Sequence, residues 1–291
     1  MLPATGGRTV RATGQGDRGR GADEEDRAGE MEPARAESEG VHPASLARLF
    51  ILIRMIGPLQ AVFFDAGNTL VQMNYPDIAQ ELGRLGARVD PSEVQRAEWR
   101  ARVRLDDEIF GHSPPGASTE SRASADRAVR YLLEELGVRD EATIARAAEW
   151  RRAYNQPLGV WNVADPQARE ALELVRGAGL RAGVISNSNG SARAILETLG
   201  LARYLDFVLD SSEVGFEKPD PRIFALALAR ARVAAGQAAY VGDLYSIDVR
   251  GARACGLHAV LLDPGGHWGE RDCPRAPDLL GVVRLLIGER P

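Results

Sequence analysis

A regular alternation of short apolar segments and amphipathic segments, which begins at Leu59, constrains the fold of this chain more than any other feature. Five of the short segments are almost continuously apolar, as is typical of parallel strands that helices cover on both faces. They span residues 60–65, 181–187, 206–210, 239–243 and 259–263. Amphipathic segments at 166–176, 191–199, 221–232 and 246–254 predict helices. The alternation therefore predicts an α/β fold with a doubly wound, Rossmann-like parallel sheet.

The interval from 74 to 160 departs from this alternation, because it contains no segment typical of a strand. Amphipathic stretches predict helices here, and they cover 92–110, 125–136 and 141–154. An all-helical insertion after the first strand predicts a second, smaller domain over 74–160. The core domain would then consist of 58–73 together with 161–291.

The N-terminal segment lacks the side chains that a core needs, since its first 40 residues contain four large apolar residues and eight glycines. Such a segment buries too little surface to offset the entropy of ordering, so we expect residues 1–57 to be a disordered extension. An alternative interpretation is that translation begins at Met55, which would make 1–54 an artefact of start-site assignment.

Composition excludes several classes of protein. The chain has 291 residues, a formal net charge of -5 and 44% hydrophobic residues, which is ordinary for a globular protein and disfavours a nucleic-acid binder. Its longest apolar run, 49–56, is too short to cross a bilayer. Cys255 and Cys273 form no CxxC pair and suggest no oxidising compartment. We expect a cytoplasmic protein with no membrane contact and no evident obligate protein partner.

Chemically active residues stand at the carboxyl ends of the predicted strands, where open α/β sheets bind their ligands. Asp65 ends the first strand and Ser186-Asn187 ends the second. Lys218 follows the third strand, and Asp243 ends the fourth, with Asp248 five residues later. These positions place an acid, a hydroxyl, a cation and two further acids on one edge of the sheet.

Three carboxylates that converge in this way repel one another, and a hard divalent cation relieves the repulsion. Mg²⁺ prefers a few carboxylates together with water and phosphate oxygens. An aspartate can attack phosphorus to form an aspartyl phosphate, a reaction that otherwise needs mainly positioning and charge neutralisation. Mg²⁺, Lys218 and Ser186 could supply this positioning and this charge neutralisation. The placement of Lys218 is informative, because it is one lysine among 35 arginines.

The pattern Asp65-x-x-x-Thr69, Ser186-Asn187, Lys218-Pro219 and Gly242-Asp243-x-x-x-x-Asp248 resembles the four motifs of the haloacid dehalogenase (HAD) superfamily. The motifs come in the family's order, each at a strand end, between Leu59 and Pro264. Most members of that family hydrolyse phosphate esters with Mg²⁺, and many carry a helical cap domain after the first motif. The resemblance thus implies a Mg²⁺-dependent hydrolase that acts on a small phosphorylated metabolite, with 74–160 as its cap.

The same resemblance implies a role for each motif residue. Asp65 would be the nucleophile, Ser186 would bind the phosphoryl group, and Lys218 would neutralise both. Asp65, the backbone carbonyl of Gly67 and Asp243 would hold the metal, with Asp248 in support. Asn187 and the amides around Gly67 would help to bind the phosphate.

Gly67 departs from the family pattern, which usually has a second aspartate there as acid for the leaving group and base for water. General acid–base catalysis is worth about 10²–10⁴-fold, so alkyl phosphates should be poor substrates without a substitute. Three interpretations remain open: substrates with good leaving groups such as acyl phosphates, an acid donated by the cap, or a catalytically weak phosphate- and metal-binding module. A lysine imine in the cap is excluded, because 74–160 contains no lysine.

A 2-haloacid dehalogenase is the alternative enzyme, since halide departure needs no proton. Family dehalogenases work without metal and lack the acidic pair of the fourth motif, whereas Asp243 and Asp248 are both present here. The sequence therefore favours a metal-dependent phosphatase. Trp161 and Tyr75 lie near the two ends of the insertion, and we expect them to pack in the core or at a hinge.

Overall fold

The computed structural model describes residues 58–111, 118–154 and 158–288. The predicted N-terminal extension, 1–57, lies outside the described residues, and so does Met55. The expectations for that segment therefore stay predictions. The remainder contains every motif residue named above.

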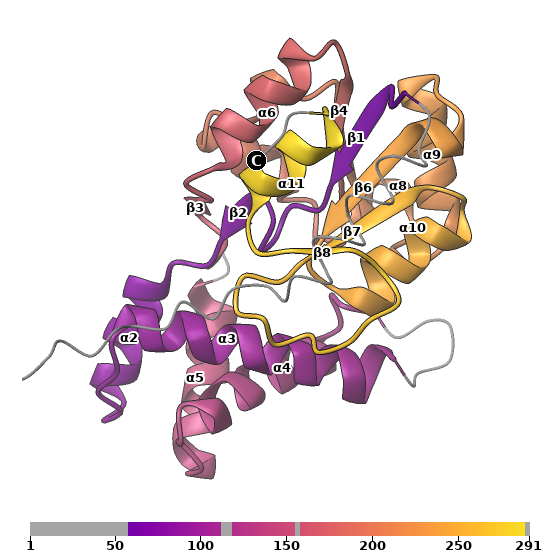
Figure 1. The fold of residues 1–291 in the computed structure, drawn as a ribbon. Coiled ribbons are helices and arrows are strands. Elements are labelled where there is room, and N and C mark those ends of the chain that lie inside the picture. The colour runs from indigo at the N-terminus through magenta and orange to yellow at the C-terminus, as the bar shows by residue number, and fades with distance from the viewer. Residues whose placement is uncertain (1–57, 112–117, 155–157, 289–291) are drawn as a thin grey trace, which may run out of the picture. The chain divides into compact units, whose positions relative to one another are not determined.

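A six-stranded sheet runs through the described chain, and all of its neighbouring strands are parallel (Figure 1). Its spatial order is β5-β4-β1-β6-β7-β8. The strands are β1 (Ala61–Phe64), β4 (Arg181–Ser186), β5 (Phe207–Asp210), β6 (Ala238–Gly242), β7 (His258–Leu262) and β8 (Arg275–Ala276). The chain moves outward in one direction through β4 and β5 and in the other through β6 to β8, so the order reverses at β1. The predicted doubly wound parallel sheet is confirmed.

The five predicted strands all occur, each with ends within one residue of the prediction. The sixth strand, β8, was not predicted because two residues are too short to show any periodicity. A π-helix, η4 (Tyr245–Val249), and α10 (Arg250–Ala254) together occupy the single helix predicted over 246–254.

The two faces of the sheet are covered by different helices, as the alternation of side chains along a strand requires. Val62 and Phe64 of β1 share one apolar cluster with α6 (Ala168–Gly177), α7 (Ala192–Thr198) and α11 (Leu279–Leu286). Ala61 and Phe63 share another with α9 (Pro221–Ala231) and α10. The short helix α8 (Ser211–Val214) follows β5. All four side chains of β1 are fully buried, which makes this strand a rigid base for the residue that follows it.

In the described part of the insertion, here called the helical block, there are four α-helices. They are α2 (Tyr75–Arg84), α3 (Pro91–Leu105), α4 (Arg122–Glu135) and α5 (Glu141–Tyr154), and a π-helix, η1 (Asp106–Phe110), extends α3. The block has its own apolar core, which includes Val94, Leu133 and Ile144. A two-stranded antiparallel pair, β2 (Val71–Gln72) and β3 (Val163–Ala164), joins the two ends of the insertion. The helices predicted in this interval occur, and α2 is an addition to them.

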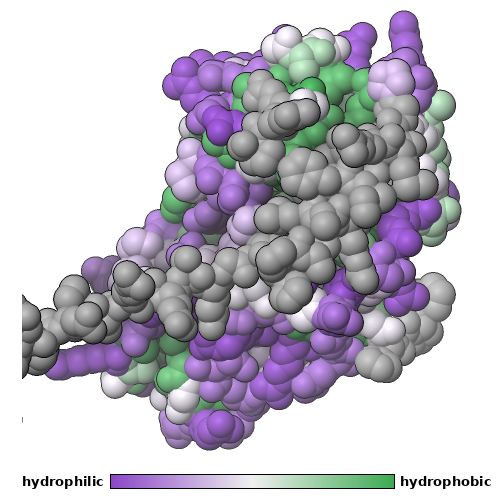
Figure 2. Space-filling view, viewed as in Figure 1, coloured by the Kyte–Doolittle hydropathy of each residue, from purple (hydrophilic) through white to green (hydrophobic). Residues whose placement is uncertain are grey.

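The helical block contacts the sheet's helices through buried polar groups as well as through side-chain packing. The carboxylate of Asp106 in η1 accepts hydrogen bonds from the backbone N–H of Ser246 at 3.1 Å and from its hydroxyl at 2.9 Å. Figure 2 shows a largely hydrophilic surface over the lower part of the view, where α3 and α4 lie in Figure 1. No helix within the described ranges has the length and apolar character that crossing a bilayer requires.

Candidate active site

The predicted residues converge at the carboxyl ends of three adjacent strands. Asp65 follows β1, Ser186 ends β4, and Asp243 follows β6, so the parallel pairing of these strands places the three residues side by side. Lys218 reaches the same place from the loop after α8. All four side chains line one cavity of about 270 Å³. The sheet thus assembles what the sequence distributes over 179 positions, from 65 to 243.

Lys218 is the centre of the charged cluster, and its side chain is only 2% exposed. Its ammonium lies 2.5 Å from Asp65 Oδ1, 2.8 Å from Asp248 Oδ1 and 2.9 Å from the Tyr240 hydroxyl. Burial by itself would lower the pKa of Lys218, but the carboxylates of Asp248 and Asp65 raise it above its usual range. The ammonium therefore stays charged beside the carboxylate that it holds.

The carboxylates of Asp65, Asp243 and Asp248 offer ligand atoms that lie within 4.8 Å of one another, and all three side chains are buried. Burial raises the pKa of Asp65 against the opposing effect of Lys218. Burial likewise raises the pKa of Asp243, although the guanidinium of Arg102 opposes it. Such a concentration of buried negative charge is stabilised by cations.

The fit of this cluster to a divalent ion depends on which carboxylate oxygens already accept hydrogen bonds. Within the described chain, Asp65 Oδ2 and Asp243 Oδ1 accept no hydrogen bond, so each residue keeps one oxygen for a ligand. Asp248 is different, because its Oδ2 accepts the backbone N–H groups of Asp243 and Leu244 at 3.1 and 2.9 Å. A hard cation that takes few carboxylates and several waters fits this donor set.

Gly242 explains how Asp248 comes so close to the backbone. A Cβ added at position 242 would lie 2.5 Å from the carboxyl carbon of Asp248 and 2.7 Å from its Cβ. Any side chain at 242 would push Asp248 away from the N–H groups that it accepts. The glycine of the fourth motif is thus required by the position of Asp248.

Ser186 and Asn187 occupy different situations, although both line the cavity. The hydroxyl of Ser186 makes a single long contact, 3.4 Å to the carbonyl of Asn187, and is available to a ligand. The Asn187 amide is fully used: Oδ1 accepts from Lys218 N at 2.7 Å, while Nδ2 donates to Lys218 O at 2.9 Å and Thr119 Oγ1 at 3.0 Å. The Asn187 side chain thus holds the backbone of Lys218, since both of its amide hydrogens are already donated, and the expectation that Asn187 helps to bind phosphate stays a prediction.

Gly67 lies beneath Trp161. A Cβ added at 67 would stand 3.5 Å from the six-membered ring of Trp161, at ordinary van der Waals distance. The indole therefore packs against position 67, so a side chain there would contact its ring. Trp161 does more than the predicted packing near a hinge, since it covers the position where an acid is missing.

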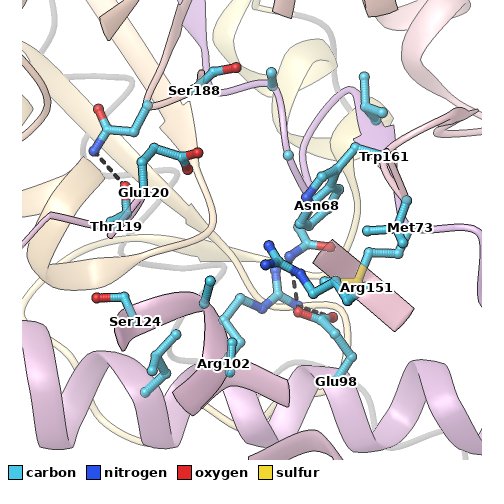
Figure 3. Close-up of a pocket in the computed structure, with 18 of the residues that line it drawn as sticks. Asn68, Met73, Glu98, Arg102, Thr119, Glu120, Ser124, Arg151, Trp161 and Ser188 are labelled. Atoms are coloured by element: carbon cyan, nitrogen blue, oxygen red, sulfur yellow. Dashed lines mark hydrogen bonds and ion pairs between the residues drawn. The ribbon is translucent and has the colours of Figure 1, made fainter. Parts of the chain in front are cut away.

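Three further residues at the site were not predicted. Arg102 of α3 donates from its NH1 to Asp243 Oδ2 at 2.8 Å, and Glu98 lies one turn earlier, 3.5 Å from Arg102 NH2. Asn68 donates to Glu98 at 3.0 Å and to Asp243 at 3.3 Å. Figure 3 shows Arg102 and Glu98 together on the wall that α3 forms. A glutamate and an arginine four residues apart are typical of an exposed helical pair, so no sequence pattern predicts the burial of Glu98 and Arg102.

The two remaining walls of the cavity differ, because one is apolar and the other carries polar side chains. Figure 3 shows Met73 and Trp161 on one side and Thr119, Glu120 and Ser188 on the other. Apolar lining residues from the helical block include Leu105, Phe110, Val129 and Leu132. A buried aspartate held by a lysine, beside carboxylates suited to a cation, together with a parallel α/β sheet, defines a class of hydrolytic or phosphoryl-transfer proteins.

Comparisons with known proteins are consistent with this class. A family model described as haloacid dehalogenase-like hydrolase matches residues 59–256. A human protein, haloacid dehalogenase-like hydrolase domain-containing protein 3, is 33% identical over 246 residues, which are 80% of this chain and 97% of that protein. A phosphoserine phosphatase of Thermus thermophilus is 38% identical over 165 residues, which are 56% of this chain and 63% of that protein.

A solved structure titled as a dehalogenase with an intermediate complex shares the fold. Its TM-score is 0.56 at 22% sequence identity, and the likeness covers 80% of this chain and 100% of that one. At this identity the likeness concerns the fold alone. By the match of the family model and the human relative, the chain belongs to the haloacid dehalogenase-like hydrolases.

Proposed function

We propose that this hydrolase is a Mg²⁺-dependent phosphatase that acts on a small phosphorylated metabolite through an aspartyl phosphate at Asp65. The observation that carries the proposal is the contact of Lys218 with Asp65 inside a buried acidic cluster that fits a divalent ion. The similarity to a phosphoserine phosphatase supports a phosphate substrate in general.

The proposed reaction has two displacements. Asp65 Oδ2, which no described donor contacts, attacks phosphorus, and the bond between phosphorus and the leaving oxygen breaks. Water then attacks the aspartyl phosphate, which releases inorganic phosphate and restores Asp65. Lys218 fixes the orientation of the Asp65 carboxylate, and the Ser186 hydroxyl donates to a phosphoryl oxygen.

Asp65, Asp243 and the backbone carbonyl of Gly67 would hold the metal, with Asp248 in support through its hold on the Asp243 backbone. When bound, Mg²⁺ supplies charge neutralisation at the phosphoryl oxygens. Arg102 adds a second positive charge at Asp243. We infer that the helical block, as a cap, closes the cavity above these residues and that its apolar wall selects the organic part of the substrate.

A catalytically weak binding module is the second candidate, and one observation favours it. Residue 67 has no side chain, so the acid that family phosphatases usually carry at this position is absent. A dehalogenase is less well supported, because the acidic cluster fits a cation that halide displacement does not need.

The test is hydrolysis of an aryl phosphate and an acyl phosphate by the full chain with Mg²⁺. Asp65→Asn should lower kcat/KM by at least about 10³-fold, because the nucleophile is removed. Asp206→Asn is the matched control, since Asp206 stands exposed before β5, at the opposite end of the strands. Equal rates for the wild type and Asp65→Asn would contradict the proposed function. An inert wild type whose Tm rises with Mg²⁺ and beryllium fluoride would favour the binding module.

A further inference from the structure

The reaction proposed above leaves one proton without a source. An alkoxide leaving group needs a proton as its bond to phosphorus breaks, and residue 67 has no side chain to donate one. The ring of Trp161 lies over the same position. Any donor must therefore come from another part of the cavity wall.

Six carboxyl side chains line the cavity, and they differ in what they already contact. They are Asp65, Glu81, Glu98, Glu120, Asp243 and Asp248. Five of them bind a cation: Lys218 binds Asp65 and Asp248, Arg102 binds Asp243 and Glu98, and Arg84 binds Glu81. Glu98 also accepts from Asn68 and Tyr75. Among the residues that the structure describes, no donor or cation contacts the Glu120 carboxylate at hydrogen-bond or ion-pair distance.

The backbone around Glu120 is fixed against the proposed phosphate-binding residues. Its neighbour Thr119 accepts a hydrogen bond from Asn187 at 3.0 Å, and Asn187 in turn holds the backbone of Lys218. On the other side, the hydroxyl of Ser121 caps α4 by accepting from Ser124 N at 3.1 Å. Figure 3 shows the Glu120 side chain extending from the Thr119 wall into the cavity.

The charges that face Glu120 come from three parts of the fold. Glu120 is partly exposed to solvent, yet desolvation by the surrounding cavity wall raises its pKa to about 7, and Arg151 of α5 opposes this rise. From the core, Glu217 and Asp210 raise the pKa, while Lys218 lowers it. A carboxyl group whose pKa is raised toward neutral pH is suited both to donating and to accepting a proton.

We propose that Glu120, carried into the cavity by the helical block, is the general acid–base residue that takes the place of the missing aspartate. This inference rests on the proposed phosphatase function. As Asp65 bonds to phosphorus, the electron pair of the breaking bond stays on the leaving oxygen, which takes the Glu120 proton and departs as an alcohol. The Glu120 carboxylate then takes a proton from the water that attacks the aspartyl phosphate, and the original protonation state returns.

The experiment compares 2-phenylethyl phosphate, a poor leaving group, with 2,4-dinitrophenyl phosphate, a good one, on the full chain with Mg²⁺. Glu120→Gln should lower kcat/KM by about 10²–10⁴-fold for the alkyl ester and by only a few-fold for the aryl ester. The parameter kcat/KM is the appropriate one, because it reports the steps up to alcohol release. Wild-type kcat/KM for the alkyl ester should fall as pH rises above about 7, and this fall should vanish in Glu120→Gln.

Glu149→Gln is the matched control, since Glu149 is an exposed glutamate of α5 that does not line the cavity. Glu149→Gln should leave kcat/KM unchanged for both esters. An active wild type in which Glu120→Gln affects both esters equally, or neither, overturns this inference and leaves the proposed function intact. A wild type inert on both esters overturns the proposed function and this inference with it.

Discussion

Two halves of the cavity floor hold buried carboxylates with a cation, and they are built in different ways. In the lysine half, Lys218 binds Asp65 and Asp248, and all three residues come from the sheet domain. In the arginine half, Arg102 binds Asp243 and Glu98, and two of these three residues come from α3 of the helical block. The first half is complete within the core, whereas the second exists only where the block meets the core.

This difference indicates a division of labour. Asp65 directly follows β1, whose four side chains are fully buried, and Lys218, which binds Asp65, is itself buried in the core. The charge on Asp243 depends on contact with α3, so any movement of the helical block would change it. We therefore expect the core to hold Asp65 and Lys218 rigidly. The charge at Asp243 should respond to the position of the helical block, which also carries Glu120.

The largest effect is expected from the lysine half. Lys218→Met leaves two buried carboxylates without a cation, which should lower the free energy of unfolding by about 3–5 kcal/mol and abolish activity. The deficit should shrink at low pH. A carboxyl whose pKa is raised in the folded state destabilises the fold once pH exceeds its unfolded value, and protonation removes that cost.

Urea unfolding at several pH values measures this effect. Arg222→Met is the control, because it breaks an exposed ion pair with Asp220 and should leave the free energy of unfolding nearly unchanged. A Lys218→Met variant as stable as the control would show that Lys218 does not stabilise the fold through Asp65 and Asp248.

A smaller and metal-dependent effect is expected from the arginine half. Arg102→Met removes the cation from Asp243 and Glu98 and should destabilise the metal-free protein by about 3 kcal/mol. Added Mg²⁺ should then raise the Tm of the variant more than that of the wild type, because in the variant Mg²⁺ no longer competes with the Arg102 guanidinium for the charge of Asp243.

Thermal unfolding with Mg²⁺ and with EDTA tests the competition. Arg100→Met serves as control, since Arg100 pairs with Glu135 on a more exposed face of α3. Identical Mg²⁺ shifts in the wild type and Arg102→Met would mean that the arginine half and the metal do not compete.

The smallest effect is a gain that needs two changes. Gly67→Asp by itself should improve kcat/KM for an alkyl phosphate only slightly, because the new Cβ would lie 3.5 Å from the indole of Trp161, which restricts the rotamers of the aspartate. Gly67→Asp combined with Trp161→Ala should raise it by about tenfold relative to Trp161→Ala. An equal gain from Gly67→Asp in the presence of Trp161 would show that the ring is no obstacle.

The sequence was sufficient for the sheet and for the residues at its edge. Continuous apolar runs fixed the five long strands, and strand ends in a parallel sheet meet at one edge, so the neighbourhood of Asp65, Ser186, Lys218 and Asp243 followed from the pattern. The position of Lys218 was informative, because the other 35 residues of the Lys and Arg class are all arginine. Two-residue strands such as β8 carried no periodic signal and were missed.

Only the tertiary structure decided which residues of the helical block reach the site. Arg102 is one of 35 arginines, and its helical spacing from Glu98 has the same appearance whether the pair is exposed or buried. The packing of the insertion on the core likewise decides three other features of the site. They are the contact of Asn187 with Thr119, the position of Trp161 over Gly67 and the entry of Glu120 into the cavity. Periodicity determines each element by local geometry, whereas contacts between elements depend on side-chain packing over long sequence separations, which no local pattern encodes.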